Sequence, residues 1–202
     1  MVAQPRVATA SCVEEADSLR VHLTAESRAA RIWNAAWAIG FGVAAAGQLT
    51  LALTETKPLG TFDTDFEEQM YVGTTKASLG LAVRLVLPLR VRVPATTSDP
   101  CTDVAALRGA LAEAGRRERR AFWFTLIGGT TVNLAGALLL WQRRNFETGA
   151  LSFATGVPIG PLSAFTQPRE SWKLWGARRA MWTAGVGGVG GEPRSLWIAG
   201  EF

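Results

Sequence analysis

The stretch "LGLAVRLVLPLRVRV", residues 79–93, separates two architectures for this chain. Every odd position in it is Leu or Val, and the even positions are Gly80, Ala82, Arg84, Val86, Pro88, Arg90 and Arg92. Strict alternation is typical of a β-strand with one apolar face. The same residues also fit the end of a membrane helix that carries a charged side chain. The stretch therefore belongs either to an outer-membrane β-barrel or to a helical membrane bundle.

The distribution of charge along the 202 residues indicates a membrane protein. Four windows, 32–54, 70–89, 121–142 and 148–166, contain only two ionised side chains, Lys76 and Arg84. A soluble protein places charges along every amphipathic element, because each element needs a face in water. Windows of about 20 apolar residues instead match the thickness of a bilayer when they are helical. The sequence predicts four membrane spans.

Aromatic residues lie near the ends of these windows, where indole and phenol rings favour the level of the lipid headgroups. A helix from the first to the last Trp of the third window would rise about 27 Å, which is close to one bilayer core. We predict an interfacial aromatic set of Trp33, Trp37, Tyr71, Trp123, Trp141, Trp172 and Trp175.

Helices are favoured over a barrel by composition. The first window is rich in Ala, a strong helix former, whereas "QLTLALTET" at 48–56 and the terminal Phe202 support the barrel alternative. Small residues every fourth position allow membrane helices to approach closely. Two such helix-packing faces are predicted, one of Ala36, Gly40 and Ala44, and one of Thr125, Gly129, Asn133 and Ala137. We therefore predict an all-α bundle of four transmembrane helices, with 79–93 at the end of the second.

The segments outside the spans are predicted from their polarity. Residues 1–31 form a polar helical segment, and residues 167–202 form a basic and aromatic segment followed by a Gly-rich tail. Between spans two and three, residues 103–120 form an amphipathic helix capped by Asp103, with one apolar face of Val104, Leu107, Leu111 and Ala114.

Lys and Arg set the predicted orientation. The side that holds both termini carries 16 of them outside the spans, and the other side carries 3. Positive loops stay in the cytoplasm, so we expect an inner or plasma membrane protein with cytoplasmic termini and free thiols at Cys12 and Cys101. The same two cysteines are a candidate disulfide, and Ala8-Thr9-Ala10 resembles a signal-peptidase site, so export or an outer-membrane location is the alternative.

Catalytic and metal-binding patterns are absent from the sequence. His22 is the single histidine, so no specific catalytic triad can be assembled around it. The two cysteines are too far apart in the sequence to give, with His22, the ligand spacing of a zinc site. "GVGGVG" at 185–190 has no strand before it and no helix after it, so it is not a dinucleotide fingerprint. We predict no enzyme, no cofactor and no metal site, and no motif identifies a family.

Partners are predicted from charge and packing faces. "RRERR" at 116–120 and "RESWKLWGARR" at 169–179 suit anionic lipid headgroups beside the bilayer, which leaves no case for nucleic-acid binding. We expect a structural membrane subunit that packs against a copy of itself or a partner subunit. The alternative is a small anion-favouring channel or transporter that uses Lys76 and Arg84. For both cations, snorkelling to the headgroups is the favoured interpretation.

Overall fold

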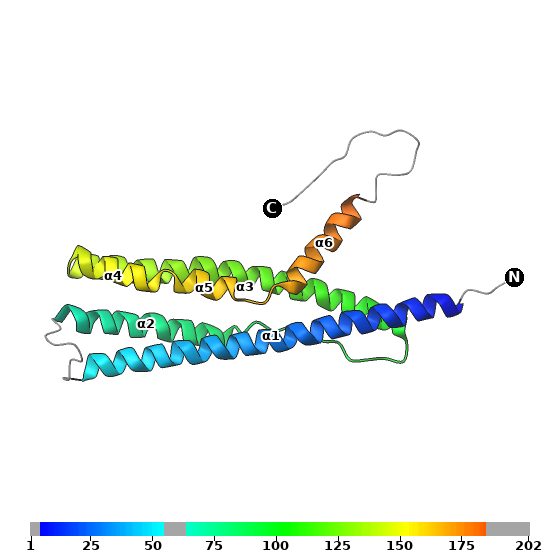
Figure 1. Ribbon diagram of the computed structural model, residues 1–202, viewed down its shortest axis with the longest axis horizontal. Coiled ribbons are helices and arrows are strands. Elements are labelled where there is room, and N and C mark those ends of the chain that lie inside the picture. Colours follow the sequence, from blue (N-terminus) through cyan, green and yellow to red (C-terminus); the bar gives the residue numbers. More distant parts are fainter. Residues whose placement is uncertain (1–4, 55–63, 185–202) are drawn as a thin grey trace, which may run out of the picture. The chain divides into compact units, whose positions relative to one another are not determined.

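The computed structural model describes residues 5–54 and 64–184, and the regular secondary structure in this part of the chain is entirely helical, with no strand. The predicted helical class is confirmed, and the β-barrel alternative is not supported. Most of the Gly-rich tail and residues 55–63, between the first two predicted spans, lie outside the described residues. The helices are α1 (Pro5–Leu53), α2 (Thr64–Val86), α3 (Pro100–Arg143), α4 (Phe146–Gly156), α5 (Ile159–Phe165) and α6 (Glu170–Ala184), as Figure 1 shows.

The stretch 79–93 is helical only as far as Val86, three residues short of the predicted end. Pro88 disfavours the helical conformation of Leu87, which precedes it. Beyond this point the backbone is held by Asn34 of α1. Its side-chain Nδ2 donates to the carbonyl of Leu89 at 2.8 Å, and its Oδ1 accepts from the same residue's N–H at 3.1 Å. Leu89 is buried there, so the alternating stretch consists of a helix end followed by a segment without regular secondary structure.

The chain forms two compact units, each made of segments distant in sequence. Unit 1 comprises residues 1–26, 91–118 and 169–202, and unit 2 comprises residues 27–90 and 119–168. Both α1 and α3 run without interruption from one unit into the other. The predicted amphipathic helix and third span are therefore one helix.

In unit 1, α3 buries the apolar face expected from its spacing: Val104, Leu107, Leu111 and Ala114 are all at most 6% exposed. The N-terminal cap is Asp99, whose carboxylate accepts from the N–H groups of Cys101 and Thr102. The prediction that Asp103 caps this helix is wrong, because α3 begins three residues earlier. Asp103 instead accepts hydrogen bonds from Thr97 and from Arg20 of α1.

Covalent and ionic links also join α1 to α3 in unit 1. Cys12 and Cys101 form a disulfide, so the expectation of two free thiols differs from the structure. One turn further along α1 and two turns further along α3, the guanidinium of Arg108 binds the Glu15 carboxylate through two hydrogen bonds of 2.8 and 2.6 Å. These links hold two helix segments that are far apart in the chain.

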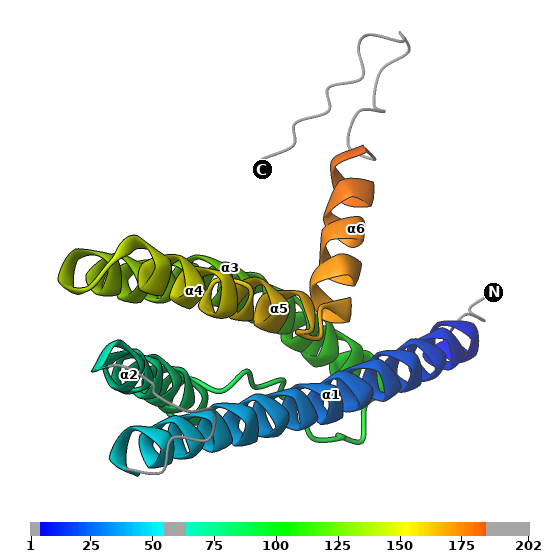
Figure 2. The same ribbon diagram turned by 60° about the vertical axis from the view of Figure 1, so that its left-hand side comes forward.

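In unit 2, α4 and α5 replace the single fourth span predicted for 148–166. They follow one another alongside the second half of α3 (Figure 1 and Figure 2). Pro158 has no N–H to donate to the preceding turn, which interrupts the helix. Val157 and Pro158 nevertheless keep helical dihedral angles, so α5 continues the direction of α4.

The small residues of α3 permit this close approach. A Cβ on Gly160 would lie 2.9 Å from the backbone nitrogen of Thr130 and 3.0 Å from the carbonyl carbon of Gly129. A Cβ on Gly149 would lie 3.0 Å from the carbonyl oxygen of Ala137. The face of Thr125, Gly129, Asn133 and Ala137 thus lies against α4 and α5.

The corresponding face on α1 makes no such contact. Ala36, Gly40 and Ala44 are exposed, and nothing lies within 4 Å of a Cβ built on Gly40. This face therefore has no packing contact within unit 2, and its packing against a partner helix stays a prediction. A neighbouring face of α1, which carries Phe41 and Gln48, lies against Gly80 and Gly73 of α2 instead. Larger side chains bury more apolar area, so this face is preferred.

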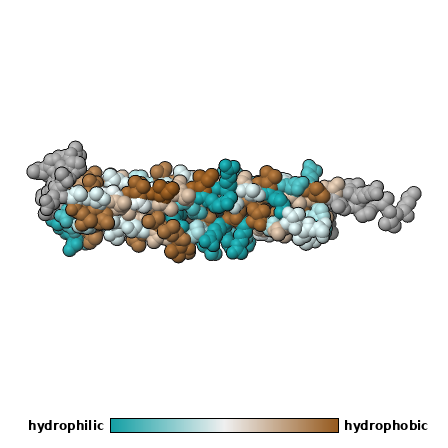
Figure 3. All heavy atoms as spheres, turned by 90° about the horizontal axis from the view of Figure 1, so that it is seen from below, coloured by the Kyte–Doolittle hydropathy of each residue, from teal (hydrophilic) through white to brown (hydrophobic). Residues whose placement is uncertain are grey.

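Within residues 5–54 and 64–184, two helices are long and apolar enough to cross a membrane: α1, over Ala10–Leu53, and α3. Many large apolar side chains of unit 2 are also exposed, among them Ile39, Val43, Leu85, Ile127 and Phe165. Figure 3 shows one face of the molecule, on which hydrophobic residues gather in patches beside a band of hydrophilic residues. Exposed apolar surface of this extent is typical of a protein that meets lipid.

Candidate functional site: a cationic cavity in unit 2

Arg84 is buried inside unit 2, with 7% of its surface exposed. Its Nη2 donates to the hydroxyl of Ser163 at 2.7 Å and lies 3.4 Å from the hydroxyl of Thr125. The guanidinium carbon lies 4.1 Å from the centroid of the Trp33 ring, a cation–π distance. Arg84 therefore points into the helix bundle and not toward the headgroups, in contrast to the predicted snorkelling.

Lys76 lies two turns earlier on α2 and is half-buried. Its Nζ donates to the hydroxyl of Ser152 at 3.0 Å. Two glycines make room for the side chain, because a Cβ on Gly136 would lie 2.9 Å from Lys76 Cδ and one on Gly156 would lie 3.2 Å from Nζ. The same point at Gly156 is 2.5 Å from the side-chain oxygen of Asn133, so an amide also lies beside the ammonium.

Neither cation has an anionic partner among the described residues, where the ion pairs involve other side chains. The Nε of Arg84 is buried and has no hydrogen-bond partner. A guanidinium has five donors, so hydroxyl groups leave part of its capacity unused. The site combines positive charge with spare donors.

Two cavities meet at Lys76. The smaller, of about 150 Å³, is lined by both cations together with Phe41, Thr125, Asn133 and Ser163. The larger, of about 930 Å³, is more open, and its lining includes Lys76, Tyr71, Val72 and Gly136. The two cations predicted to share an inward face thus line one cavity.

An ion-paired group lines the larger cavity. Glu68 accepts hydrogen bonds from Arg143 at 3.2 Å and from Arg144, and all three line the cavity. Along α2, Glu68, Lys76 and Arg84 follow at intervals of eight residues, each about 12 Å of helix. Polar groups therefore recur at regular depths along the two cavities.

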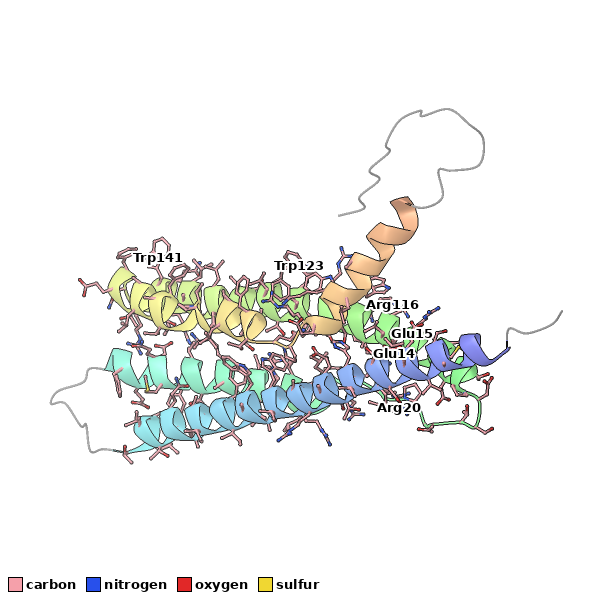
Figure 4. All side chains as sticks on the ribbon, turned by 45° about the vertical axis from the view of Figure 1, so that its right-hand side comes forward. Glu14, Glu15, Arg20, Arg116, Trp123 and Trp141 are labelled. Atoms are coloured by element: carbon pink, nitrogen blue, oxygen red, sulfur yellow. A yellow bond between two sulfur atoms is a disulfide. The ribbon has the colours of Figure 1, made fainter. Side chains whose placement is uncertain are left out.

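The predicted interfacial aromatics fall into three sets. Trp33 is buried at 6% exposure, and both its indole N–H and that of Trp37 donate to the Thr166 hydroxyl, at 3.3 and 3.1 Å. Trp123 and Trp141 are about half exposed and project outward from α3 (Figure 4), and Tyr71 is 40% exposed. Trp33 supports the cation site, whereas the exposed set is free to meet lipid. Trp172 and Trp175 are half-buried in unit 1.

The site includes residues that the sequence did not single out. Ser152 and Ser163 are 3% and 1% exposed, and each binds one of the cations. Both serines lie inside an apolar window of the sequence. A buried hydroxyl group there needs a hydrogen-bond partner, so these residues could have been recognised as candidates. Among the described residues, no group of three or more His, Cys, Asp or Glu side chains is arranged to hold a metal ion.

Comparisons with known proteins give no match to any family model, curated protein or solved structure. The cavity and its two cations are therefore the features of this chain that indicate a function.

Proposed function

We propose that this chain is a non-enzymatic, four-span membrane protein that carries small anions along the cavities lined by Lys76 and Arg84. The observation that carries the proposal is the buried guanidinium of Arg84, which has a vacant donor and no carboxylate partner. An ionised side chain within a membrane span costs about 2.5 kcal/mol or more, so such residues usually face a water-filled path or a ligand. An anion would supply the missing charge.

The spacing of Lys76 and Arg84 supports the movement of an anion through the protein as well as its binding. Lys76 and Arg84 are eight residues apart on one helix, or about 12 Å. A small inorganic anion contacts one of them at a time. Conduction requires several sites that each bind weakly enough to release the ion. Two cations at different depths, each shared with a neutral serine, meet this requirement.

A structural subunit remains the second candidate. It is supported by the exposed face of Ala36, Gly40 and Ala44, which has no partner within unit 2 and would suit a second helix. This candidate assigns no task to Arg84. The two proposals therefore differ in what happens when that charge is removed.

For orientation, we propose an inner or plasma membrane with both termini in the cytoplasm, because 16 of the Lys and Arg residues outside the spans lie on the terminal side. The basic residues beside the spans would then meet anionic headgroups. The disulfide between Cys12 and Cys101 favours the opposite orientation, since disulfides rarely persist in the cytoplasm. Labelling experiments separate these two assignments.

The function is tested by anion flux into liposomes that contain the purified protein. Arg84→Leu and Lys76→Leu should each lower chloride or nitrate flux by about tenfold or more, while circular dichroism remains that of a helical protein. Arg92→Leu is the matched control, because Arg92 is an exposed cation outside the helices, and its flux should be unchanged. Equal flux in all four proteins, or no flux in the wild type, would reject the anion path and support the structural subunit.

A further inference from the structure

Unit 1 buries two carboxyl groups that the proposed function does not use. Glu118 of α3 is fully buried and Glu26 of α1 is 5% exposed. Both side chains accept hydrogen bonds from the same turn of α6, so the two carboxyl groups lie close together. Two like charges at close range in a buried site disfavour ionisation of both groups, so the pair favours a single shared proton.

Both carboxyl groups bind the first turn of α6. Glu26 Oε1 accepts from the backbone N–H of Glu170 at 3.1 Å, and Glu118 Oε2 accepts from that of Trp172 at 2.8 Å. The first N–H groups of a helix have no partner within it and need acceptors from elsewhere. Here two distant helices supply them, so the start of α6 is attached to both.

Close packing supports the same attachment. A Cβ on Gly115 of α3 would lie 3.1 Å from the carbonyl oxygen of Ser171 and 3.1 Å from Cβ of Trp175. Ser171 is fully buried at this contact. A larger residue at position 115 would push α6 away from α3, since backbone atoms cannot move aside cheaply.

We infer that Glu26 and Glu118 form a proton-dependent latch that holds the first turn of α6 in unit 1. With the shared proton in place, both carboxyl groups accept the N–H groups of α6. Without the shared proton, two negative charges lie close together in a buried site. This repulsion is relieved when α6 leaves and the two carboxylates become exposed to water. The latch makes the docking of a basic, aromatic helix depend on pH.

The direction of the pH dependence follows from Glu118. Burial raises the pKa of Glu118 from 4.5 to about 8, the charge of Glu26 acts in the same direction, and the Trp172 N–H opposes them. A raised pKa means that the docked state holds the proton more tightly. Docking is therefore strongest below about pH 4.5 and is lost as the pH rises through about 8.

Other charged groups surround the latch and have to be separated from it. His22 lies on α1 and interacts electrostatically with Glu170, as does Arg169. Lys173 of α6 forms an ion pair with Glu170 at 2.6 Å. A substitution confined to Glu118 leaves all of these in place, so any titration that they cause would persist in that variant.

The test is hydrogen exchange of the full-length protein in detergent, followed by mass spectrometry of peptides that cover 169–177, between pH 6.5 and 9. After correction for intrinsic rates, the wild type should exchange at least about tenfold faster at pH 9 than at pH 6.5. Glu118→Gln keeps an oxygen acceptor but cannot ionise, so its protection should be the same at both values. Glu113→Gln is the matched control on α3, where the carboxylate is half exposed and paired with Arg116 and Arg117.

A second variant tests whether the readout reports docking. Gly115→Leu should exchange rapidly over 169–177 at every pH, because α6 cannot approach α3. Exchange in Gly115→Leu equal to that of the wild type would overturn the latch, since α6 would then not be docked. A pH dependence that persists unchanged in Glu118→Gln, or its absence in the wild type, would overturn it as well.

Discussion

The two units bury charge of opposite sign and leave it in different states. In unit 1 the buried Glu26 and Glu118 accept backbone N–H groups of a helix end, and Arg20 is paired with Asp103 at 2.9 Å. In unit 2 the buried Arg84 meets hydroxyl groups and an aromatic face. The two glutamates of unit 1 attach a helix end, whereas the guanidinium of unit 2 has no carboxylate partner among the described residues. A buried charge is therefore informative about function when its donors or acceptors are not used up.

The largest effect is expected where α5 is held against α3, because this contact brings Ser163 to Arg84. Gly160→Leu should prevent assembly of unit 2 at a cost of about 3 kcal/mol or more, since its side chain would meet backbone atoms of α3. Gly40→Leu is the matched control, with open space around it, and should leave thermal unfolding by circular dichroism unchanged. Similar unfolding temperatures for the two variants would remove the structural basis of the cation site.

In unit 1 the next largest effect is expected from the disulfide. Cys101→Ser should destabilise unit 1 by about 2–4 kcal/mol, because the bond restrains two helix segments 89 residues apart in the chain. Faster hydrogen exchange over 100–118, with 64–86 unchanged, would be the expected result. Equal acceleration in both segments would mean that the units do not differ in what stabilises them.

The redox state of the same pair tests the proposed orientation. Cells lysed in an alkylating reagent should yield modified Cys12 and Cys101 if unit 1 lies in the cytoplasm, where thiols stay reduced. Introduced cysteines in 55–69 should then be labelled from outside the cell, and those in 103–118 should not. Recovery of an intact disulfide, with labelling in 103–118, would reverse the orientation and place unit 1 outside.

A smaller effect on stability is expected from Asp103, the carboxylate of unit 1 that is paired with Arg20. Hydrogen bonds from Thr97, followed by the charge of Arg20, lower the pKa of Asp103 below 3.8. A lowered pKa stabilises the folded state at a pH above the pKa of the unfolded chain. This contribution is lost as the pH falls through the pKa of the folded state. Asp103→Asn should therefore lower the unfolding temperature more at pH 7 than at pH 3.

The corresponding change in unit 2 is Arg84→Leu, which should leave the unfolding temperature equal or higher. Replacing an unpaired buried charge by an apolar side chain is often neutral or stabilising. Thermal unfolding at pH 7 compares the two variants directly. A large loss of stability in Arg84→Leu would show that Arg84 is a structural residue, like Asp103.

Local features of the fold follow from the sequence. The buried face of α3 in unit 1 has a spacing of three and four residues, which specifies a helix surface whatever packs on it. The helical class follows from Ala content and from the length of the apolar windows. The four-residue repeat of small residues on α3 marks its contact with α4 and α5. These are properties of single segments.

The surroundings of Arg84 depend on residues far along the chain, and for this reason the sequence prediction of snorkelling differs from the structure. Its partners Thr125 and Ser163 are 41 and 79 positions away. The repeat at Ala36, Gly40 and Ala44 fits a packing face as well as that of α3 does, yet Phe41 and Gln48 on another side of α1 make the contacts. Which of two suitable faces is used depends on the partner helices.

The most direct test of the central claim is the ion selectivity of the wild-type protein in a planar bilayer under a tenfold gradient of potassium chloride. If Lys76 and Arg84 line the path, the reversal potential should lie near the chloride equilibrium value, because cations are repelled from both positions. Arg84→Leu should abolish this current, and Arg92→Leu should preserve it. A reversal potential near the potassium value, or a chloride current that survives Arg84→Leu, would contradict the account.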